Sequence, residues 1–166
     1  TSQTTKKYDG NPYEAQIVVK DKNGEEVKNP NVKYTYYKGL KKLDKAPTEI
    51  GKYKVVATFT GDKAHIGSIA SKNFEITKGD LVVKVHNQEK TYGQEDPKLE
   101  YSVEGIVGDD VVEFDTYREE GENAGTYAIN VRETELSNYN YEVTPGNLTI
   151  NKADLKVIVD NQSKVY

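Results

Sequence analysis

The 166-residue chain contains no cysteine, no methionine and no tryptophan. Without cysteine there can be no disulfide, no thiolate nucleophile and no cysteine-ligated zinc site. The missing methionine leads us to expect a cut or processed piece of a longer chain. No apolar run approaches the ~18 residues of a membrane-spanning helix, and no signal peptide or wall-anchoring motif is present. We therefore expect no membrane contact and expect any targeting signal to lie elsewhere in the parent protein.

An excess of one charge is also missing. The net charge is -4, 30% of the residues are charged, and lysines alternate with acidic residues along the chain. The chain therefore has no continuous run of basic residues that could bind a phosphate backbone, and we expect no nucleic-acid partner. Leucine and alanine, which favour helices, are scarce, whereas the chain has 13 tyrosines against 3 phenylalanines. Tyrosine, valine and threonine favour half-buried strands, so the composition predicts an all-β protein.

The chain repeats itself. Residues Asn73 to Tyr92 recur as Asn147 to Tyr166, an offset of 74 residues, with eleven of twenty positions identical and no gap. Gly51-Lys52-Tyr53 matches Gly125-Thr126-Tyr127 at the same offset, whereas Tyr8 matches Tyr92 only at an offset of 84. A repeat at a fixed period indicates a tandem array. We divide the chain into a first repeat (1–78), a second repeat (79–152) and the first strand of a truncated third repeat (153–166).

Alternating apolar residues predict the strands. In the first repeat they are Tyr13 to Lys20, Val32 to Tyr37, Lys52 to Thr60 and Lys72 to Lys78, with an Asn23-Gly24 turn after the first. In the second repeat they are Asp80 to His86, Leu99 to Val103, Val112 to Phe114, Tyr127 to Val131, and a closing hairpin of Asn140 to Thr144 and Asn147 to Ile150 that turns at Pro145-Gly146. Many short strands with turns between them predict two tandem, small Ig-like β-sandwich domains.

A glycine two residues before a tyrosine at a strand start supports the sandwich. Gly51-x-Tyr53 and Gly125-x-Tyr127 resemble the tyrosine corner of Ig-like domains, where the hydroxyl bonds to upstream backbone. Both tyrosines are predicted to be mostly buried. The alternative, a β-grasp-like unit, would need a helix for which the sequence shows no period.

Several motifs of the second repeat resemble a known family. They are Gly79 to Val85, the K-x-Y-G run Lys90 to Gly93, the D-P-x-L run Asp96 to Leu99, Gly121 to Tyr127 and Tyr139 to Ile150. They are similar to the YGX-type MBG repeats of bacterial surface proteins and adhesins. The first repeat, with Tyr8-Asp9-Gly10, Ala46-Pro47-Thr48 and Gly51-Lys52-Tyr53, resembles related YDG or Ig-like repeats.

The resemblance implies an extracellular, cell-wall-attached, multi-repeat protein of a Gram-positive bacterium. It therefore predicts a stalk or spacer that projects a distal binding domain. The alternative that it leaves open is repeats that themselves bind host mucin or other glycoprotein glycans. Some wall-protein repeats of this general kind carry a lysine–asparagine isopeptide crosslink, but the sequence does not place the buried acid that such a bond needs.

The residues suggest little chemistry. His65 and His86, the only histidines, lack acids at ligand spacing, and the acidic runs Asp109-Asp110 and Glu119 to Glu122 lack the alternating oxygens of a calcium loop. Tyrosine clusters at Tyr34 to Tyr37 and Tyr139 to Tyr141 suit either sugar stacking or core packing. We therefore expect no enzyme, no catalytic or metal-binding residue and no cofactor.

The expected partners are neighbouring repeats of the same chain and, on the alternative reading, host glycans. We expect a mostly monomeric chain. Residues Leu155, Val157 and Val159 nevertheless form an apolar face that a third repeat would cover, and an uncovered strand tends to pair with another sheet. The sequence thus predicts head-to-tail strand exchange through 153–166.

Overall fold

The computed structural model describes residues 4–166, which form β-strands and irregular segments. No helix occurs among the described residues, and so none that could span a bilayer. The chain folds as two compact units. Unit 1 contains the described residues up to Leu81, together with Gly105–Val111 and Glu135–Tyr141, and unit 2 contains Val82–Glu104, Val112–Thr134 and Glu142–Tyr166. The all-β prediction is confirmed.

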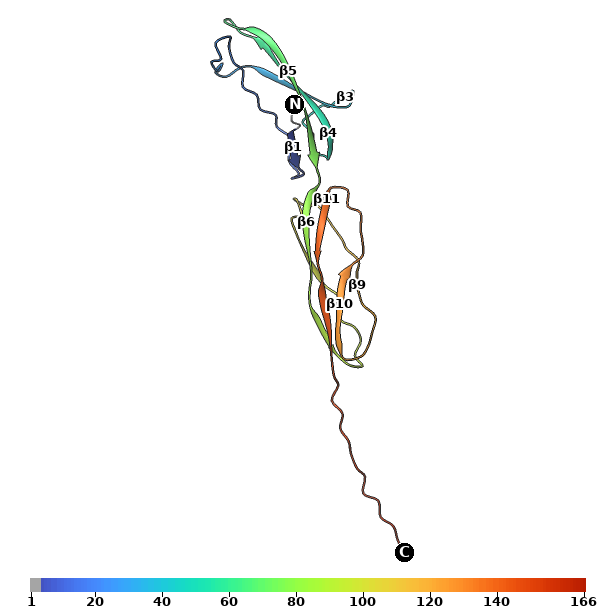
Figure 1. The fold of residues 1–166 in the computed structure, drawn as a ribbon. Helices are drawn as coiled ribbons and strands as arrows, with labels where there is room; N and C mark the ends of the chain where they lie inside the picture. Colours follow the sequence, from blue (N-terminus) through green and yellow to red (C-terminus); the bar gives the residue numbers. More distant parts are fainter. Residues whose placement is uncertain (1–3) are drawn as a thin grey trace. The chain divides into compact units, whose positions relative to one another are not determined.

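One five-stranded sheet forms the first repeat (Figure 1). Its strands are β1 (Thr4–Lys7), β2 (Val32–Lys38), β3 (Lys41–Lys42), β4 (Gly51–Gly61) and β5 (Ile66–Thr77). Their order in the sheet is β1-β5-β4-β2-β3. The long strand β4 pairs antiparallel with both β2 and β5, whereas β1 runs parallel to the last four residues of β5.

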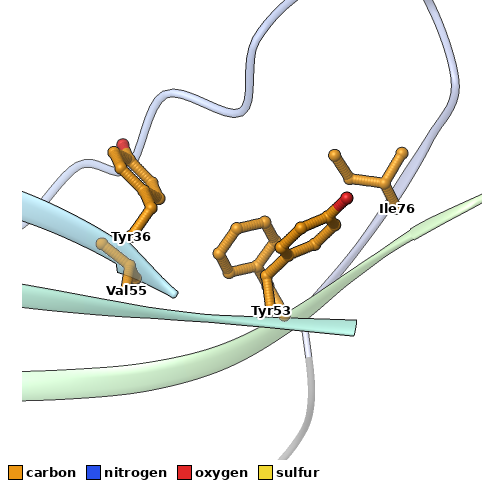
Figure 2. Packing of buried hydrophobic residues seen from close by; sticks show 5 residues of the cluster. Tyr36, Tyr53, Val55 and Ile76 are labelled. Atoms are coloured by element: carbon orange, nitrogen blue, oxygen red, sulfur yellow. The ribbon is translucent and has the colours of Figure 1, made fainter. Parts of the chain in front are cut away.

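Alternate residues of β4 face the core of unit 1, as predicted. The buried set is Tyr53, Val55, Ala57 and Phe59. Phe74 on β5 is completely buried, and its ring stacks with those of Tyr53 and Tyr13, at centroid distances of 5.5 Å and 3.7 Å. Tyr36, Val55 and Ile76 complete the buried cluster around Tyr53 (Figure 2). Aromatic residues bury a large area at low entropic cost, so this cluster is the main apolar core of the first repeat.

The second repeat is a sandwich of two sheets. Its strands are β6 (Gly79–Val85), β7 (Gln88–Thr91), β8 (Tyr101–Glu104), β9 (Thr116–Arg118), β10 (Gly125–Val131), β11 (Tyr139–Thr144) and β12 (Gly146–Asn151). One sheet has the order β11-β6-β8 and the other β7-β12-β10-β9. Leu81, Val83, Ile129, Leu148 and Ile150 are almost fully buried. The fold is therefore a small β-sandwich, and the β-grasp alternative has no helix to support it.

The two repeats share a strand pairing that the sequence offsets describe. In the first repeat Thr4 pairs with Phe74, and in the second Gln88 pairs with Leu148, both in parallel ladders. The first members of these pairs are 84 residues apart and the second members 74. Both offsets therefore correspond to one ladder that occurs in each repeat, with β1 as the counterpart of β7.

The tyrosine corner is present twice. The Tyr53 hydroxyl donates a hydrogen bond to the Glu49 carbonyl oxygen at 2.9 Å, and the Tyr127 hydroxyl donates to the Asn123 carbonyl oxygen at the same distance. Each acceptor precedes its tyrosine by four residues, so the bond holds the turn against the start of the strand. Tyr53 is buried as predicted, whereas Tyr127 is half-buried.

The predicted closing hairpin is wrong. β11 and β12 belong to different sheets, so the chain crosses the sandwich at Pro145-Gly146 without reversing. Proline ends the first ladder because it lacks an N–H. Gly146 is needed because a Cβ there would lie 2.7 Å from the His86 carbonyl oxygen and 2.9 Å from that of Val85. Pro145 and Gly146 thus mark the point where the chain passes from one sheet to the other. In the sequence this pair cannot be distinguished from a reverse turn.

Two predicted strands are also wrong. Residues 13–19 are irregular, and Lys20 makes only an isolated antiparallel bridge with Glu26 across the predicted Asn23-Gly24 turn. The Tyr13 amide bonds to the Pro47 carbonyl oxygen at 2.9 Å and the Ala15 amide to the Tyr36 hydroxyl. These acceptors lie in a loop and a side chain, so no ladder forms. Residues 112–114 are irregular as well, since the Phe114 amide bonds to the Tyr101 hydroxyl at 3.0 Å, and the strand β9 begins later.

Beyond β12 the chain is extended and exposed. Residues 152–166 form no strand with any other described residue, and all of them are exposed. The predicted strand at 153–166 is therefore not formed within this chain.

Candidate functional site

The residues singled out from the sequence are engaged in local structure. His65 Nδ1 lies 2.8 Å from Asp62 Oδ1 in a turn, and His86 is exposed on the other repeat. Within residues 4–166 no group of three histidines or acids has a geometry that could hold a metal ion.

The acidic runs supply hydrogen-bond acceptors to their own surroundings. In unit 1 the Asp110 carboxylate accepts bonds from the hydroxyls of Tyr8 and Tyr139, at 3.2 Å and 2.5 Å. In unit 2 Glu119 accepts a bond from the Ala128 amide at 3.1 Å. Asp110 and Glu119 are therefore engaged in hydrogen bonds within their own units.

The tyrosine clusters are mostly packing residues. Tyr36 and Tyr139 are buried, and Tyr34 packs half-buried against the core of the first repeat. Tyr37 and Tyr141 are half-buried as well. A stacking platform for sugar needs an exposed ring face, which the buried Tyr36 and Tyr139 do not offer.

The strongest constellation of charges lies in unit 2, where the K-x-Y-G, D-P-x-L and G-E-N motifs of the second repeat meet. Lys90 comes from β7, Asp96 from the following loop, Glu122 from the loop before β10, and Arg118 from β9. Lys90 Nζ lies 2.7 Å from Asp96 Oδ1 and 2.5 Å from Glu122 Oε2. Arg118 Nε lies 2.6 Å from Asp96 Oδ2, and its Nη2 pairs with Glu122. Two cations and two anions thus form a closed cycle, named here the four-charge cluster.

Burial makes this cluster unlike a surface ion pair. The side chains of Lys90 and Arg118 are only 4% and 12% exposed, whereas those of Asp96 and Glu122 are 38% and 63% exposed. A buried ammonium or guanidinium is stable only when it is paired and hydrogen-bonded. The cluster therefore holds residues 90–96 against residues 118–122, with its cations inside and its anions at the surface.

The loop that carries Glu122 is shaped around Tyr127. Gly121 has a φ of 144°, and a Cβ on it would lie 2.2 Å from the Tyr127 ring. Only glycine fits there, and its carbonyl oxygen accepts a bond from Arg118 Nη1 at 2.8 Å. The Arg118 guanidinium also lies 5.7 Å from the centroid of the Tyr127 ring. The tyrosine corner and the four-charge cluster are therefore one connected assembly.

Protein-family models match the same parts of the chain in which these motifs lie. A family model described as the MBG domain (YGX type) matches residues 81–149, and a second MBG domain model matches residues 1–80. The chain is a tandem of MBG domains. MBG domains occur in surface adhesin-like proteins and are generally structural, non-catalytic domains. No curated protein matches the chain.

Electrostatics keep all four groups of this MBG domain charged. Hydrogen bonds from Arg118 and Lys90 lower the pKa of Asp96, and bonds from Lys90 and Arg118 lower the pKa of Glu122. The bond to Asp96, followed by that to Glu122, raises the pKa of Lys90. At neutral pH these shifts favour the ionised forms, in keeping with the ion-pair distances of 2.7 Å and 2.5 Å from Lys90.

Sequence reasoning missed Lys90 and Arg118 as partners. Lys90 lies within a motif, and it is identical to Lys164 at the 74-residue offset, which was the only signal. Arg118 lies in none of the motifs. In the first MBG domain the counterpart lysine, Lys6, pairs with Asp9 at 2.8 Å and donates to the Asn11 carbonyl oxygen. The four-charge cluster is thus a feature of the second MBG domain.

Substitution of Asp96 by asparagine tests the cluster. It removes the anion shared by Lys90 and Arg118, and we expect a loss of about 2 kcal/mol in unfolding free energy, a value reduced for the partial exposure of Asp96. The matched control is Glu104→Gln, which breaks the exposed Lys84–Glu104 pair and should cost less than about 0.5 kcal/mol. Urea unfolding of both variants measures the difference, and equal losses would contradict a special role for the cluster.

The stabilisation that Asp96 contributes to the folded state should depend on pH. Carboxyl groups with lowered pKa in the folded state stabilise it above their unfolded pKa, near pH 4, and this stabilisation is lost as the pH falls through the folded values. The difference between Asp96→Asn and the native chain should therefore be full at pH 7 and shrink at about pH 2. A difference unchanged by acid would show that it does not arise from charge.

Proposed function

We propose that this tandem is a stalk segment of a bacterial surface adhesin, attached to the cell wall of a Gram-positive bacterium. In this role the domains act by geometry, since they hold a distal binding domain away from the cell surface. The occurrence of MBG domains in surface adhesin-like proteins supports the setting, and their generally structural nature supports the role.

The observation that carries the proposal is the connection between the two domains. β5 ends at Thr77 and β6 begins at Gly79, so a single residue, Lys78, separates them. Within unit 1 the Lys78 ammonium donates to the Leu136 carbonyl oxygen at 2.6 Å, and the Gly79 amide donates to the Asn138 carbonyl oxygen at 2.9 Å. A connection this short and this well bonded favours a stiff link over a flexible one.

A cluster of two tyrosines and one aspartate in unit 1 supports the same role. Tyr8 and Tyr139 meet edge to face at 5.6 Å and both donate to Asp110. Burial, followed by the bond to Asp110, raises the pKa of each tyrosine. Both hydroxyls therefore stay protonated and remain donors over the whole physiological range.

Stiffness of the link is measurable because the chain has no cysteine. Exposed Lys63 and Glu120 can be changed to cysteine and spin-labelled, and the distribution of distances between the labels recorded. We expect a narrow distance distribution in the native chain. After several Gly and Ser residues are inserted between Lys78 and Gly79, we expect a much broader distribution. Equally broad distributions in both would contradict the stalk role.

The alternative function is binding of host mucin or other glycoprotein glycans by the domains themselves. A glycan array with mucin-type structures separates the two functions. A stalk segment should give no signal above a control domain, whereas specific, saturable binding would favour the alternative.

A further inference from the structure

The net charge of -4 hides an uneven distribution between the two repeats. Residues 1–78 contain fifteen lysines and nine acidic residues, a net charge of +6, whereas residues 79–152 contain six basic and sixteen acidic residues, a net charge of -10. Oppositely charged domains of different molecules attract one another. The first domain therefore has the charge to attract an acidic partner, and the second domain has the charge of such a partner.

Part of the positive charge of the first domain gathers on one side of its sheet. Tyr53 and Val55 are buried in the core, so Lys54 between them points to the opposite side of β4. In the ladders Lys54 lies beside Tyr37 of β2, and Tyr37 lies beside Lys42 of β3. The same alternation places four exposed lysines on this side, named here the lysine face: Lys33, Lys42, Lys52 and Lys54.

The lysine face is open to a partner. Among residues 4–166 no ion pair joins its four lysines to an acidic side chain. Glu75 is the acidic residue that the ladder places there, beside Lys52, and it is half-buried. A hollow of about 350 Å³ is lined by Lys52, Lys54 and Asn73 together with Gly39 and Tyr53. Two ammonium groups and one amide around a hollow are suitable donors for a carboxylate.

The fold does not require lysines at these positions. At the 74-residue offset the two lysines of β4 correspond to Thr126 and Ala128 of β10. On the same side of the second domain's sheet lie exposed Glu89 of β7 and exposed Glu119, whose carboxylate accepts a bond from the Ala128 amide. We name these two glutamates the glutamate face. Equivalent sides of the two sheets thus carry opposite charges.

We propose that the lysine face of one molecule docks on the glutamate face of a second copy of this chain. Half-buried Tyr37 and Val56 lie on the lysine face, and Tyr117, which is 39% exposed, lies on the same side of its sheet as Glu119. Apolar groups surrounded by polar and charged ones are the usual arrangement of a specific interface. The charges set the orientation and speed the encounter. The inference goes beyond the stalk role and does not depend on it.

Ionic strength tests the electrostatic origin of the contact. The Debye length falls from about 30 Å at 0.01 M salt to about 3 Å at 1 M salt, so exposed charges are screened at the higher concentration. In sedimentation velocity over rising protein concentration, self-association should be measurable in about 0.02 M salt and lost in 1 M salt. A chain that stays monomeric at low salt, or association that persists in 1 M salt, would overturn the proposal.

Substitutions on either face should weaken the contact. The lysine-face variant carries Lys52→Glu and Lys54→Glu. The glutamate-face variant carries Glu89→Lys and Glu119→Gln, since glutamine keeps an acceptor oxygen for the Ala128 amide. At low salt each variant should associate about tenfold or more weakly than the native chain, and urea unfolding verifies that each is folded. Undiminished association of either variant would contradict the docking.

A control separates the lysine face from the overall charge of the domain. Lys22→Glu with Lys28→Glu makes the same change in net charge as the lysine-face variant, but both residues are exposed outside the strands. This control should change the association constant less than about twofold, because docking depends on charges that lie at the contact. Equal weakening by the control and by the lysine-face variant would overturn the assignment to this face.

Mixing the two variants identifies both sides of the contact. The lysine-face variant keeps a native glutamate face, and the glutamate-face variant keeps a native lysine face. An equal mixture therefore restores one native contact and should form a one-to-one complex, with an affinity within a few-fold of the native contact, although neither variant associates alone. A mixture that stays monomeric under conditions in which the native chain associates would show that the two faces do not dock on one another.

Discussion

Replacement of Leu81 by alanine is expected to lower the free energy of unfolding by about 3 kcal/mol, within the range for buried leucines. The same change at Leu155 is expected to alter it by less than about 0.5 kcal/mol, as at ordinary surface positions. The two leucines occupy identical places in the repeated block, each preceded by aspartate. Leu81 is 1% exposed inside the sandwich and Leu155 is 90% exposed, so only one substitution leaves a cavity.

Chemical denaturation at a protein concentration too low for association measures both effects. The low concentration matters because Leu155 would gain a buried environment in any strand exchange. A similar loss at both positions would show that 153–160 already folds against its own chain, contrary to its exposure. A negligible loss at Leu81 would contradict the packing of β6 between β11 and β8.

Replacement of Tyr53 by alanine is expected to cost about 3–5 kcal/mol, the range for a large aromatic core deletion. Tyr53 is 5% exposed and stacks on the completely buried Phe74. Tyr53→Phe keeps this packing and removes only the hydrogen bond to the Glu49 carbonyl oxygen, so it should cost about 1 kcal/mol. The difference between the two variants separates the contribution of the ring from that of the hydroxyl.

Tyr127 provides the matched comparison in the second domain. Its hydroxyl makes the same bond to a carbonyl oxygen four residues earlier, but its ring is only half-buried. Tyr127→Phe should therefore cost as much as Tyr53→Phe, whereas Tyr127→Ala should cost clearly less than Tyr53→Ala. Thermal or urea unfolding of the four variants tests this order, and an equal cost for both alanine variants would contradict it.

Local pattern was sufficient for several elements. Alternation along Lys52 to Thr60 predicted both the strand β4 and its buried face, and the repeated block predicted β6 with Leu81, Val83 and Val85 inside. The Gly-x-Tyr spacing predicted the tyrosine corner twice. In each case the local sequence is sufficient, because alternate residues of a strand face one side whichever strands pair with it, or because the same short pattern occurs twice in the chain.

Other features depended on contacts between distant segments. Lys90 and Arg118 look like ordinary strand lysine and arginine residues, and only the folded chain brings them to Asp96 and Glu122. Tyr13 to Lys20 has the composition of a strand, but its amides find acceptors in Pro47 and Tyr36 and no ladder forms.

What the sequence by itself determined is the all-β class, the tandem repeat, the MBG family and most strands with their inward faces, because side-chain alternation has a period of two residues and repeats are visible directly. What only the tertiary structure decided is which strand lies beside which. Pro145-Gly146 reads as a turn in the sequence, yet it carries the chain from one sheet to the other. Residues 153–160 read as a strand, yet they pair with no other described residue. A local pattern shows which residues can form a strand, whereas pairing joins residues that are far apart in the chain.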